Sequence, residues 1–432
     1  MSLNVPRNQP GLFGASSADR WPQQILTWLP LSLFFPVGLM YAGVLLFYAA
    51  LLAAGDWRAK WQRLKQHPLL WPILSLTAVS SISALLQHSE LVTNDEFWSG
   101  FGHYQTYLLL LPFLTLEAGA WQRRALHVFF AGAVLAASLF VANFFQLLPD
   151  NTLFRSYVHY LGNKSILLGI LLALAAGWML HELRLRSDHR WLRLLALVYV
   201  IAALVLLSKT RTASLLFLAM AALMILRNVR CSWRSLALPL ALVLALGAAT
   251  EYALRMPPPA TCIINDAQVA PWDVVRIRAV CSVQQLRDFS AGRKVGEDGM
   301  RLEIYRITAG MIAQQPWSGY GIAAWMPQYR QRAIGLSSAT MSTPHNDYLL
   351  YLSELGVFGL LALLAIWISQ LALAWRMARS ALPAQREQAM LLAMLSVAMM
   401  LGAMFNAILR DGVFAMACMI LLALPLAGVR RS

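Results

Sequence analysis

The amino-acid sequence predicts an all-α polytopic membrane protein, with about 12 transmembrane helices and one large outward loop between the ninth and tenth of them. Hydrophobic residues make up 59% of the 432 residues, and charged residues only 13%. A soluble protein carries about a quarter charged residues, so this chain has too little polar surface for a water-exposed globule. Apolar runs of about twenty residues recur along the chain, which is the length that a helix needs to cross a bilayer.

The expected membrane helices follow the apolar runs in chain order. The run from Gln24 to Gly55 is long for one helix and short for two, and Pro30 and Pro36 favour a break within it. Residues 22–251 are then expected to hold nine helices, residues 252–345 the outward loop with short helices, and residues 346–429 three more helices. The predicted spans are 22–35, 37–55, 68–87, 104–120, 124–147, 165–181, 191–207, 212–226, 235–251, 347–373, 388–404 and 412–429.

The distribution of Lys and Arg predicts the orientation in the membrane. If both termini are cytoplasmic, twenty of the 35 basic residues lie on the cytoplasmic side and only five in the short outward loops. Positive charge is enriched in cytoplasmic loops, so residues 1–21 are expected to be a cytoplasmic, mobile tail and residues 430–432 a cytoplasmic C-terminus. The net charge of +15 therefore reflects topology, and we expect membrane lipids rather than nucleic acid as partners.

The loop of residues 252–345 is the one sizeable soluble element in the prediction. Residues from Leu302 to Ile312 recur at helical spacing, and the segment from Gln315 to Gly321 should end that helix. Loops of this length are uncommon unless they are functional. Cys262 and Cys281 both lie in the loop and are expected to form a disulfide in an oxidising compartment.

Lys209 and Arg211 interrupt a hydrophobic stretch on the side where positive charge is disfavoured. A cation near the bilayer costs about 2.5–3.5 kcal/mol, so it needs an offset. The functional interpretation is an anionic partner such as a phosphate, which Arg binds bidentately. The other interpretation is an interfacial pair whose charged ends reach toward water.

Two further positions can carry chemistry. Arg301 opens the helical pattern of the loop and is either a second phosphate contact or an exposed loop arginine. His345, followed by Asn346 and Asp347, stands before a long apolar helix and can act as a general base, whereas Asn346 and Asp347 are also good residues to start a helix. No Asp-x-Asp element occurs, Asp95 and Glu96 read as solvated loop charges, and Arg410-Asp411 reads as a local ion pair or cap, so no metal or cofactor is expected.

The segment from Arg301 to Gly359 resembles the core of the O-antigen ligase and polymerase superfamily. The pattern is Arg301, then Pro316-x-x-Gly319-x-Gly321, then His345-Asn346, and then Gly356-x-x-Gly359. Thr210-Arg211-Thr212 is similar to an arginine element that begins a mid-chain helix in that superfamily. The resemblance implies a GT-C-like glycosyltransferase architecture in the bacterial inner membrane with the active site facing the periplasm.

The same resemblance implies an undecaprenyl-diphosphate-linked O-antigen as donor and lipid A-core as acceptor. His345 would be the catalytic base, while Arg211, Arg301, Lys209 and Asn346 would bind the diphosphate or the substrate. The transfer would be inverting and metal-independent, by a monomer, with the arginines in place of a divalent metal. An O-antigen polymerase and a protein O-oligosaccharyltransferase of the same superfamily remain alternatives, and a lipid-linked glycan flippase or transporter is the alternative from another class.

Overall fold

The computed structural model describes residues 19–86, 89–145, 147, 163–207, 211–228 and 297–431, together with scattered positions from 248 to 291. Every regular element within these residues is helical, which confirms the predicted all-α class. The elements are α1 (Arg20–Ser32), α2 (Val37–Ala53), α3 (Trp57–Lys65), α4 (Leu70–Leu86), α5 (Asn94–Tyr104), η2 (Thr106–Leu110), α6 (Leu111–Leu114), α7 (Ala120–Phe144), α9 (Asn163–Leu185), α10 (Arg190–Ala202), η3 (Ala203–Leu207), α11 (Arg211–Asn228), α14 (Glu297–Gln314), α15 (Trp325–Arg332), η4 (Ser337–Thr340), α16 (Asp347–Ala378), α17 (Pro383–Phe405) and α18 (Gly412–Leu426).

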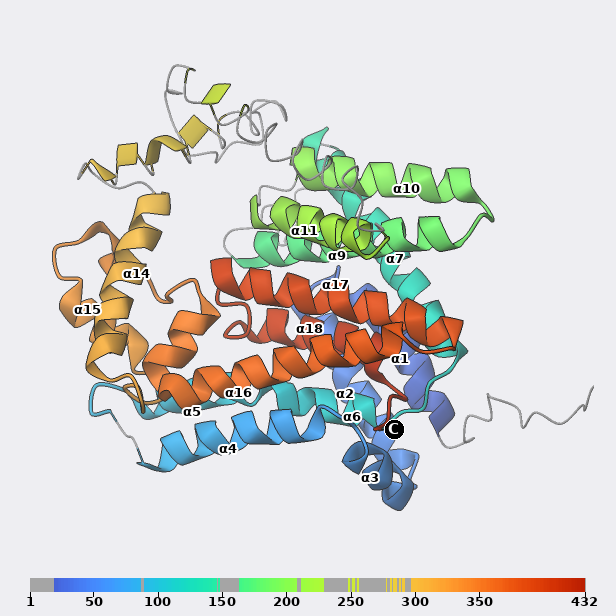
Figure 1. Cartoon of the computed structure of the whole chain (residues 1–432), viewed down its shortest axis with the longest axis horizontal. Coiled ribbons are helices and arrows are strands. Elements are labelled where there is room, and N and C mark those ends of the chain that lie inside the picture. The colour runs from blue at the N-terminus through green and yellow to red at the C-terminus, as the bar shows by residue number, and fades with distance from the viewer. Residues whose placement is uncertain are drawn as a thin grey trace, which may run out of the picture.

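The long helices lie side by side, and the shorter ones gather at the two ends of the bundle (Figure 1). α14, α15, α5 and the start of α16 lie at the left end in Figure 1, whereas α3 and the C-terminus lie at the right. α16 packs along α17 and α4, and α18 packs against α17, α1 and η2. The interior helix α18 is buried along almost its whole length, so it forms the centre of the core.

Five described helices are long and apolar enough to cross a membrane, and a sixth span is possible if α2 and α3, which meet at 114°, count as one. The chain is thus a multi-pass membrane protein, but the predicted count of about twelve spans is not confirmed. The predicted span 104–120 is interrupted, because α5 ends at Tyr104 and only the 3-10 stretch η2 and the single turn α6, which contains Pro112, follow it. The predicted span 235–251 lies largely outside the described residues.

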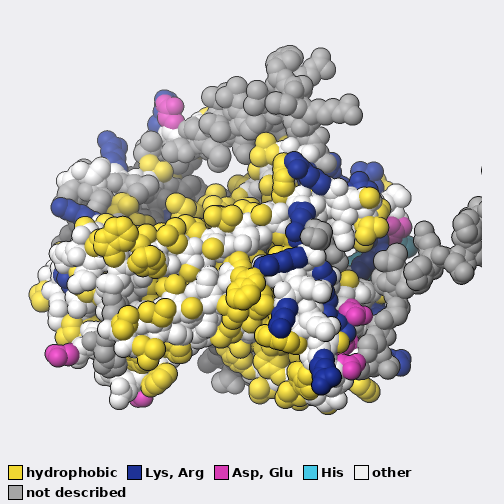
Figure 2. Space-filling view, turned by 60° about the horizontal axis from the view of Figure 1, so that its bottom comes forward, with side chains coloured by type: hydrophobic (Ala, Val, Ile, Leu, Met, Phe, Trp, Pro, Cys, Tyr) yellow, Lys and Arg dark blue, Asp and Glu magenta, His cyan; other side chains and the backbone are white. Residues whose placement is uncertain are grey.

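The prolines in the first apolar run act as expected. α1 ends at Ser32, shortly after Pro30, and Pro36 directly precedes α2. Large apolar side chains on the outer faces of the helices, such as Leu45, Leu85 and Leu192, are exposed, as lipid contact requires. Figure 2 shows hydrophobic side chains across one face, with Lys and Arg gathered mainly toward the end that holds α3 and the C-terminus.

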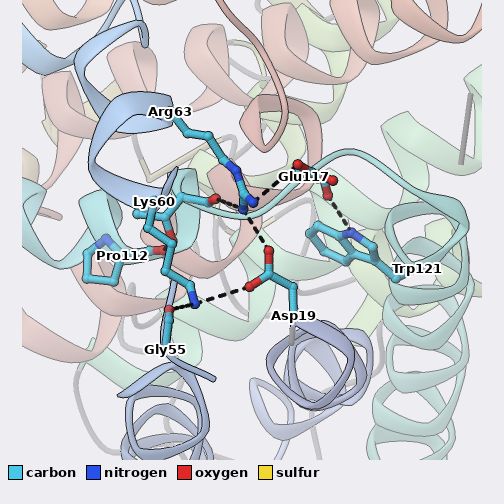
Figure 3. Close-up of polar contacts among 8 residues, drawn as sticks. Asp19, Gly55, Lys60, Arg63, Pro112, Glu117 and Trp121 are labelled. Atoms are coloured by element: carbon cyan, nitrogen blue, oxygen red, sulfur yellow. Dashed lines mark hydrogen bonds and ion pairs between the residues drawn. The ribbon is translucent and has the colours of Figure 1, made fainter. Parts of the chain in front are cut away.

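A buried ion-pair network joins α1, α3 and the connection before α7 at that end (Figure 3). The carboxylate of Asp19 lies 3.3 Å from the ammonium of Lys60 and 2.7 Å from the guanidinium of Arg63. Arg63 also lies 3.2 Å from Glu117, and Lys60 donates to the carbonyl oxygen of Gly55. Asp19, near the end of the predicted tail of residues 1–21, is 1% exposed, and α1 begins at Arg20.

Candidate functional site at the start of helix α16

His345 stands immediately before α16 in a backbone conformation that side-chain-bearing residues rarely adopt, with φ of 50°. Such strained conformations cluster at functional sites. The next residue, Asn346, caps α16 by accepting a hydrogen bond from the N–H of Leu349 (3.0 Å), as its residue type predicted. Its amide also donates to the carbonyl oxygen of Met404 (3.0 Å) at the end of α17. His345 is thus held between the start of one long helix and the end of another.

Helix α14 brings two side chains to this point. Arg301 and Tyr305 are four residues apart and therefore lie on one face of the helix. The hydroxyl of Tyr305 contacts the carbonyl oxygens of His345 (3.5 Å) and Met404 (3.4 Å). Burial raises the pKa of Tyr305, whereas the nearby charge of Arg301 lowers it. The helical pattern predicted for residues 302–312 is confirmed, and the charge of Arg301 on this helix acts on the histidine.

Arg410, in the connection between α17 and α18, supplies a second positive charge. Its guanidinium donates to the carbonyl oxygen of Ser342, three residues before the histidine. Burial, and then the charges of Arg301 and Arg410, lower the pKa of His345 to about 4. Within the described part of the chain, neither arginine forms an ion pair with a carboxylate. The imidazole is therefore neutral at pH 7 and able to accept a proton, in a positive field that an anion would neutralise.

The two glycine-containing motifs of the sequence contact each other directly. The segment from Pro316 to Gly321 runs along residues 353–357 of α16, and we call this contact the motif clasp. Its backbone hydrogen bonds run from the N–H of Tyr320 to the carbonyl of Ser353 (2.8 Å), from Gly321 to Glu354 (3.0 Å) and from Val357 to Pro316 (2.9 Å). The clasp fastens the loop between α14 and α15 to the first half of α16, which begins at the histidine.

Glycine is required at two positions of the motif clasp. Gly356 interrupts the helical geometry of α16 with φ of 67° and ψ of −164°. A Cβ atom there would lie 2.0 Å from the carbonyl oxygen of Trp317, and one on Gly319 (φ 68°) would lie 2.5 Å from the carbonyl carbon of Glu354. The same bend brings Leu355 close to the third motif glycine, Gly359, because a Cβ on Gly359 would lie 2.2 Å from the Cβ of Leu355. The motif glycines therefore shape the backbone behind the site.

The remaining predicted site residues are placed less completely. Arg211 is exposed and is the first residue of α11. α11 packs against α9 and α17. The convergence of Arg211 with His345 stays a prediction. Lys209 and Cys262 lie outside the described residues, so the Cys262–Cys281 disulfide also stays a prediction, although Cys281 is buried.

Two contributors to the site were missed by sequence reasoning. Tyr305 was noted only as part of a helical pattern, yet its position one turn after Arg301 was the signal available. Arg410 was interpreted as half of a local ion pair or cap. The capping interpretation is right for Asp411, which accepts from the N–H of Val413 (2.9 Å), but Arg410 turns toward Ser342. Asp95 and Glu96 form the first turn of α5, closed by a capping box with Thr93.

Comparison with known proteins gives one family. Residues 195–364, which include Arg211, Arg301, His345 and the motif clasp, match the family model described as O-antigen ligase. The match covers less than half of the 432 residues. None of the curated proteins compared matches the chain. Residues 195–364 of this multi-pass membrane protein are thus similar to the O-antigen ligase family.

Proposed function

We propose that the protein is an O-antigen ligase of the bacterial inner membrane. It would transfer a glycan from undecaprenyl diphosphate to a sugar hydroxyl of lipid A-core, at the periplasmic end where α14 and α15 lie. The observation that carries the proposal is a neutral histidine flanked by Arg301 and Arg410, neither of which pairs with a carboxylate in the described residues. Among the described residues no carboxylate pairs with these two cations, and the diphosphate of the donor would supply the anion.

The chemistry follows from the residue types. The imidazole of His345 removes the proton of the acceptor hydroxyl as its oxygen attacks the anomeric carbon of the donor. The bond from that carbon to the diphosphate oxygen breaks, and the charge that develops on the leaving group is stabilised by Arg301, with Arg211 as the second predicted contact. Direct displacement inverts the anomeric centre. In this scheme Asn346 positions the histidine by capping α16 and binding Met404.

Donor binding would also prepare the base. Burial, and then the charges of Arg301 and Arg410, hold the pKa of His345 below its ordinary range, and a bound diphosphate would neutralise the two charges. The pKa of the imidazole then rises toward neutrality, where general bases work best. A higher pKa makes the imidazole a stronger proton acceptor, so donor binding would favour the transfer step.

The test uses purified protein in vesicles with the lipid-linked glycan and lipid A-core, followed by product analysis. Glycan attached to lipid A-core supports a ligase, and a longer lipid-linked glycan would identify a polymerase instead. Transfer of the donor across the membrane without any product would favour the transporter. His345→Ala should lower the rate of transfer by about 10²–10⁴-fold, the usual contribution of a general base. Full activity of that variant would exclude the histidine as the base.

A further inference from the structure

A pocket of about 290 Å³ lies beside the candidate site and shares Arg410 with it. Its walls come from α5, from the start of α15, from the first half of α16 and from the connection between α17 and α18. We call it the α5 pocket. Its lining includes the side chains of Asp95, Glu96, Ser99, Glu354 and Arg410. Ligand sites in proteins occupy about 300–1,000 Å³, so this one is large enough for a sugar ring but small for a long glycan.

The carboxyl groups of Asp95, Glu96 and Glu354 outnumber the one cation of the α5 pocket, Arg410, and they suit sugar hydroxyls better than phosphate. Asp95 and Glu96 stand on its α5 side, and Ser99 lies one helical turn after them. Carboxylates accept hydrogen bonds from hydroxyl groups strongly, and they repel a diphosphate. The rings of Tyr104 and Tyr351, which meet edge to face with centroids 4.9 Å apart, add apolar surface. The anionic diphosphate therefore belongs on the side of Arg301, and a hydroxyl-rich ligand belongs in the α5 pocket.

The pocket is formed in advance of any ligand. The buried carboxylate of Glu354 accepts from the hydroxyl of Tyr104 (2.6 Å) and from the backbone N–H groups of Ala323 (3.0 Å) and Trp325 (3.2 Å). One side chain of α16 thus ties α5 to the turn before α15. Gly100 allows the close approach, since a Cβ there would lie 2.9 Å from that of Ala323. A fixed cavity spares the cost of ordering its walls on binding.

We propose that the α5 pocket is the subsite for the acceptor saccharide, an uncharged or aminated sugar whose reacting hydroxyl is directed past Arg410 toward His345. The inference rests on the proposed function, because it assumes that a hydroxyl is the nucleophile. It adds the side from which the acceptor enters and the residues that select it. Acceptors with a carboxylate or phosphate on the bound sugar should be excluded by Asp95 and Glu96.

The experiment measures binding of labelled lipid A-core to the whole protein in nanodiscs without donor, and then the KM for each substrate. Ser99→Trp places an indole in the pocket, and Asn94→Trp places the same group on α5 outside it. We expect Ser99→Trp to weaken lipid A-core binding and raise its KM by about 10-fold or more, because the ligand loses its space. The KM for the lipid-linked donor should stay within about twofold, and Asn94→Trp should leave both constants unchanged.

A milder variant tests the same proposal if the indole of Ser99→Trp disturbs folding. Asp95→Asn removes one carboxylate and should raise the KM for lipid A-core by about 3- to 10-fold through a weaker hydrogen bond. An unchanged acceptor KM in both variants, or a rise confined to the donor, would overturn the inference while leaving the ligase intact. If the wild-type protein makes no product, the proposed function fails. Binding of lipid A-core that Ser99→Trp abolishes would still support the pocket, and absence of binding to the wild type would refute it.

Discussion

The two ends of the molecule treat positive charge in opposite ways. At the end with α3, Lys60 and Arg63 share the buried carboxylate of Asp19, and Arg63 reaches Glu117 as well. At the end with α14, Arg301 and Arg410 have no carboxylate partner among the described residues, and Arg410 donates only to a backbone carbonyl. Cations neutralised by the protein itself hold elements together. Cations without a carboxylate partner among the described residues create a site for an anionic ligand.

The two ends are also fastened by different means. The Asp19 network joins α1, α3 and the connection to α7 through side-chain charges (Figure 3). The motif clasp joins the loop after α14 to α16 through backbone hydrogen bonds and close glycine contacts. A backbone clasp needs no charged side chains, so the arginines near it remain available for substrate.

The largest effect on folding should come from Asp19→Ala. The variant leaves Lys60, whose side chain is 2% exposed, without its counter-ion, and breaking a buried pair in this way costs about 3–5 kcal/mol. Unfolding in detergent by heat or denaturant measures the loss. Asp188→Ala is the control, because its ion pair with Arg193 is exposed and is worth about 1 kcal/mol or less. Equal stability of the two variants would contradict a structural role for the Asp19 network.

Arg301→Ala should lower activity rather than stability. It should lower kcat/KM for transfer by about 10²–10³-fold, equivalent to about 2.7–4 kcal/mol of transition-state stabilisation, with little change in unfolding. Arg306→Ala is the matched control, since Arg306 is an exposed arginine of the same helix. If Arg301→Ala destabilised the protein as strongly as Asp19→Ala, the distinction between open and neutralised cations would fail.

Gly356→Ala should test the motif clasp. The positive φ of residue 356 alone costs a side-chain-bearing residue about 1–3 kcal/mol. The new Cβ would also meet the carbonyl of Trp317 and force the two segments of the clasp apart. We expect lower stability together with weaker transfer, because α16 begins at the histidine. Gly310→Ala in α14 meets nothing within 4 Å and should be neutral or slightly stabilising. Identical melting of both variants would show that the close contact is not required.

The sequence predicted the parts of the molecule that depend on neighbouring residues along the chain. The long apolar runs of α7, α16 and α17 exceed what a soluble helix needs, and Asn346 is a preferred helix cap, so these features were readable directly. The family resemblance implied Arg301 and His345 as site residues without saying that they lie together, and in the structure the charge of Arg301 lowers the pKa of His345.

Features that depend on tertiary contacts could not be predicted from the sequence. Asp19 looked like part of a polar tail, because its partners Lys60 and Arg63 lie more than forty residues away on α3. Arg410 looked like half of a local pair, because nothing nearby in the chain announces its contact with Ser342. The motif spacing included the glycines of the motif clasp. It did not show that Gly319 and Gly356 lie on the two segments that meet in the clasp, each against the backbone of the other segment.

The smallest effect should be a shift in pH dependence in Arg410→Gln. Burial and the charges of Arg301 and Arg410 together hold the pKa of His345 at about 4, so removing one charge lets this pKa rise toward its ordinary value of 6.5. A base must be unprotonated, and kcat/KM for the donor reports the free enzyme. The acidic limb of that profile should therefore move to higher pH, by about half a unit to one unit, the size of a partly screened charge interaction.

Under this prediction Arg410→Gln loses more activity at pH 5 than at pH 7.5, relative to the wild type. Arg306→Gln removes a positive charge of the same kind from an exposed position of α14 and should leave the limb in place. A limb that stays fixed in Arg410→Gln, or moves to lower pH, would mean that the charge of Arg410 does not act on the histidine. Arg410 would then contribute only to the wall of the α5 pocket. The charge effect on the pKa of His345 would come from Arg301 alone.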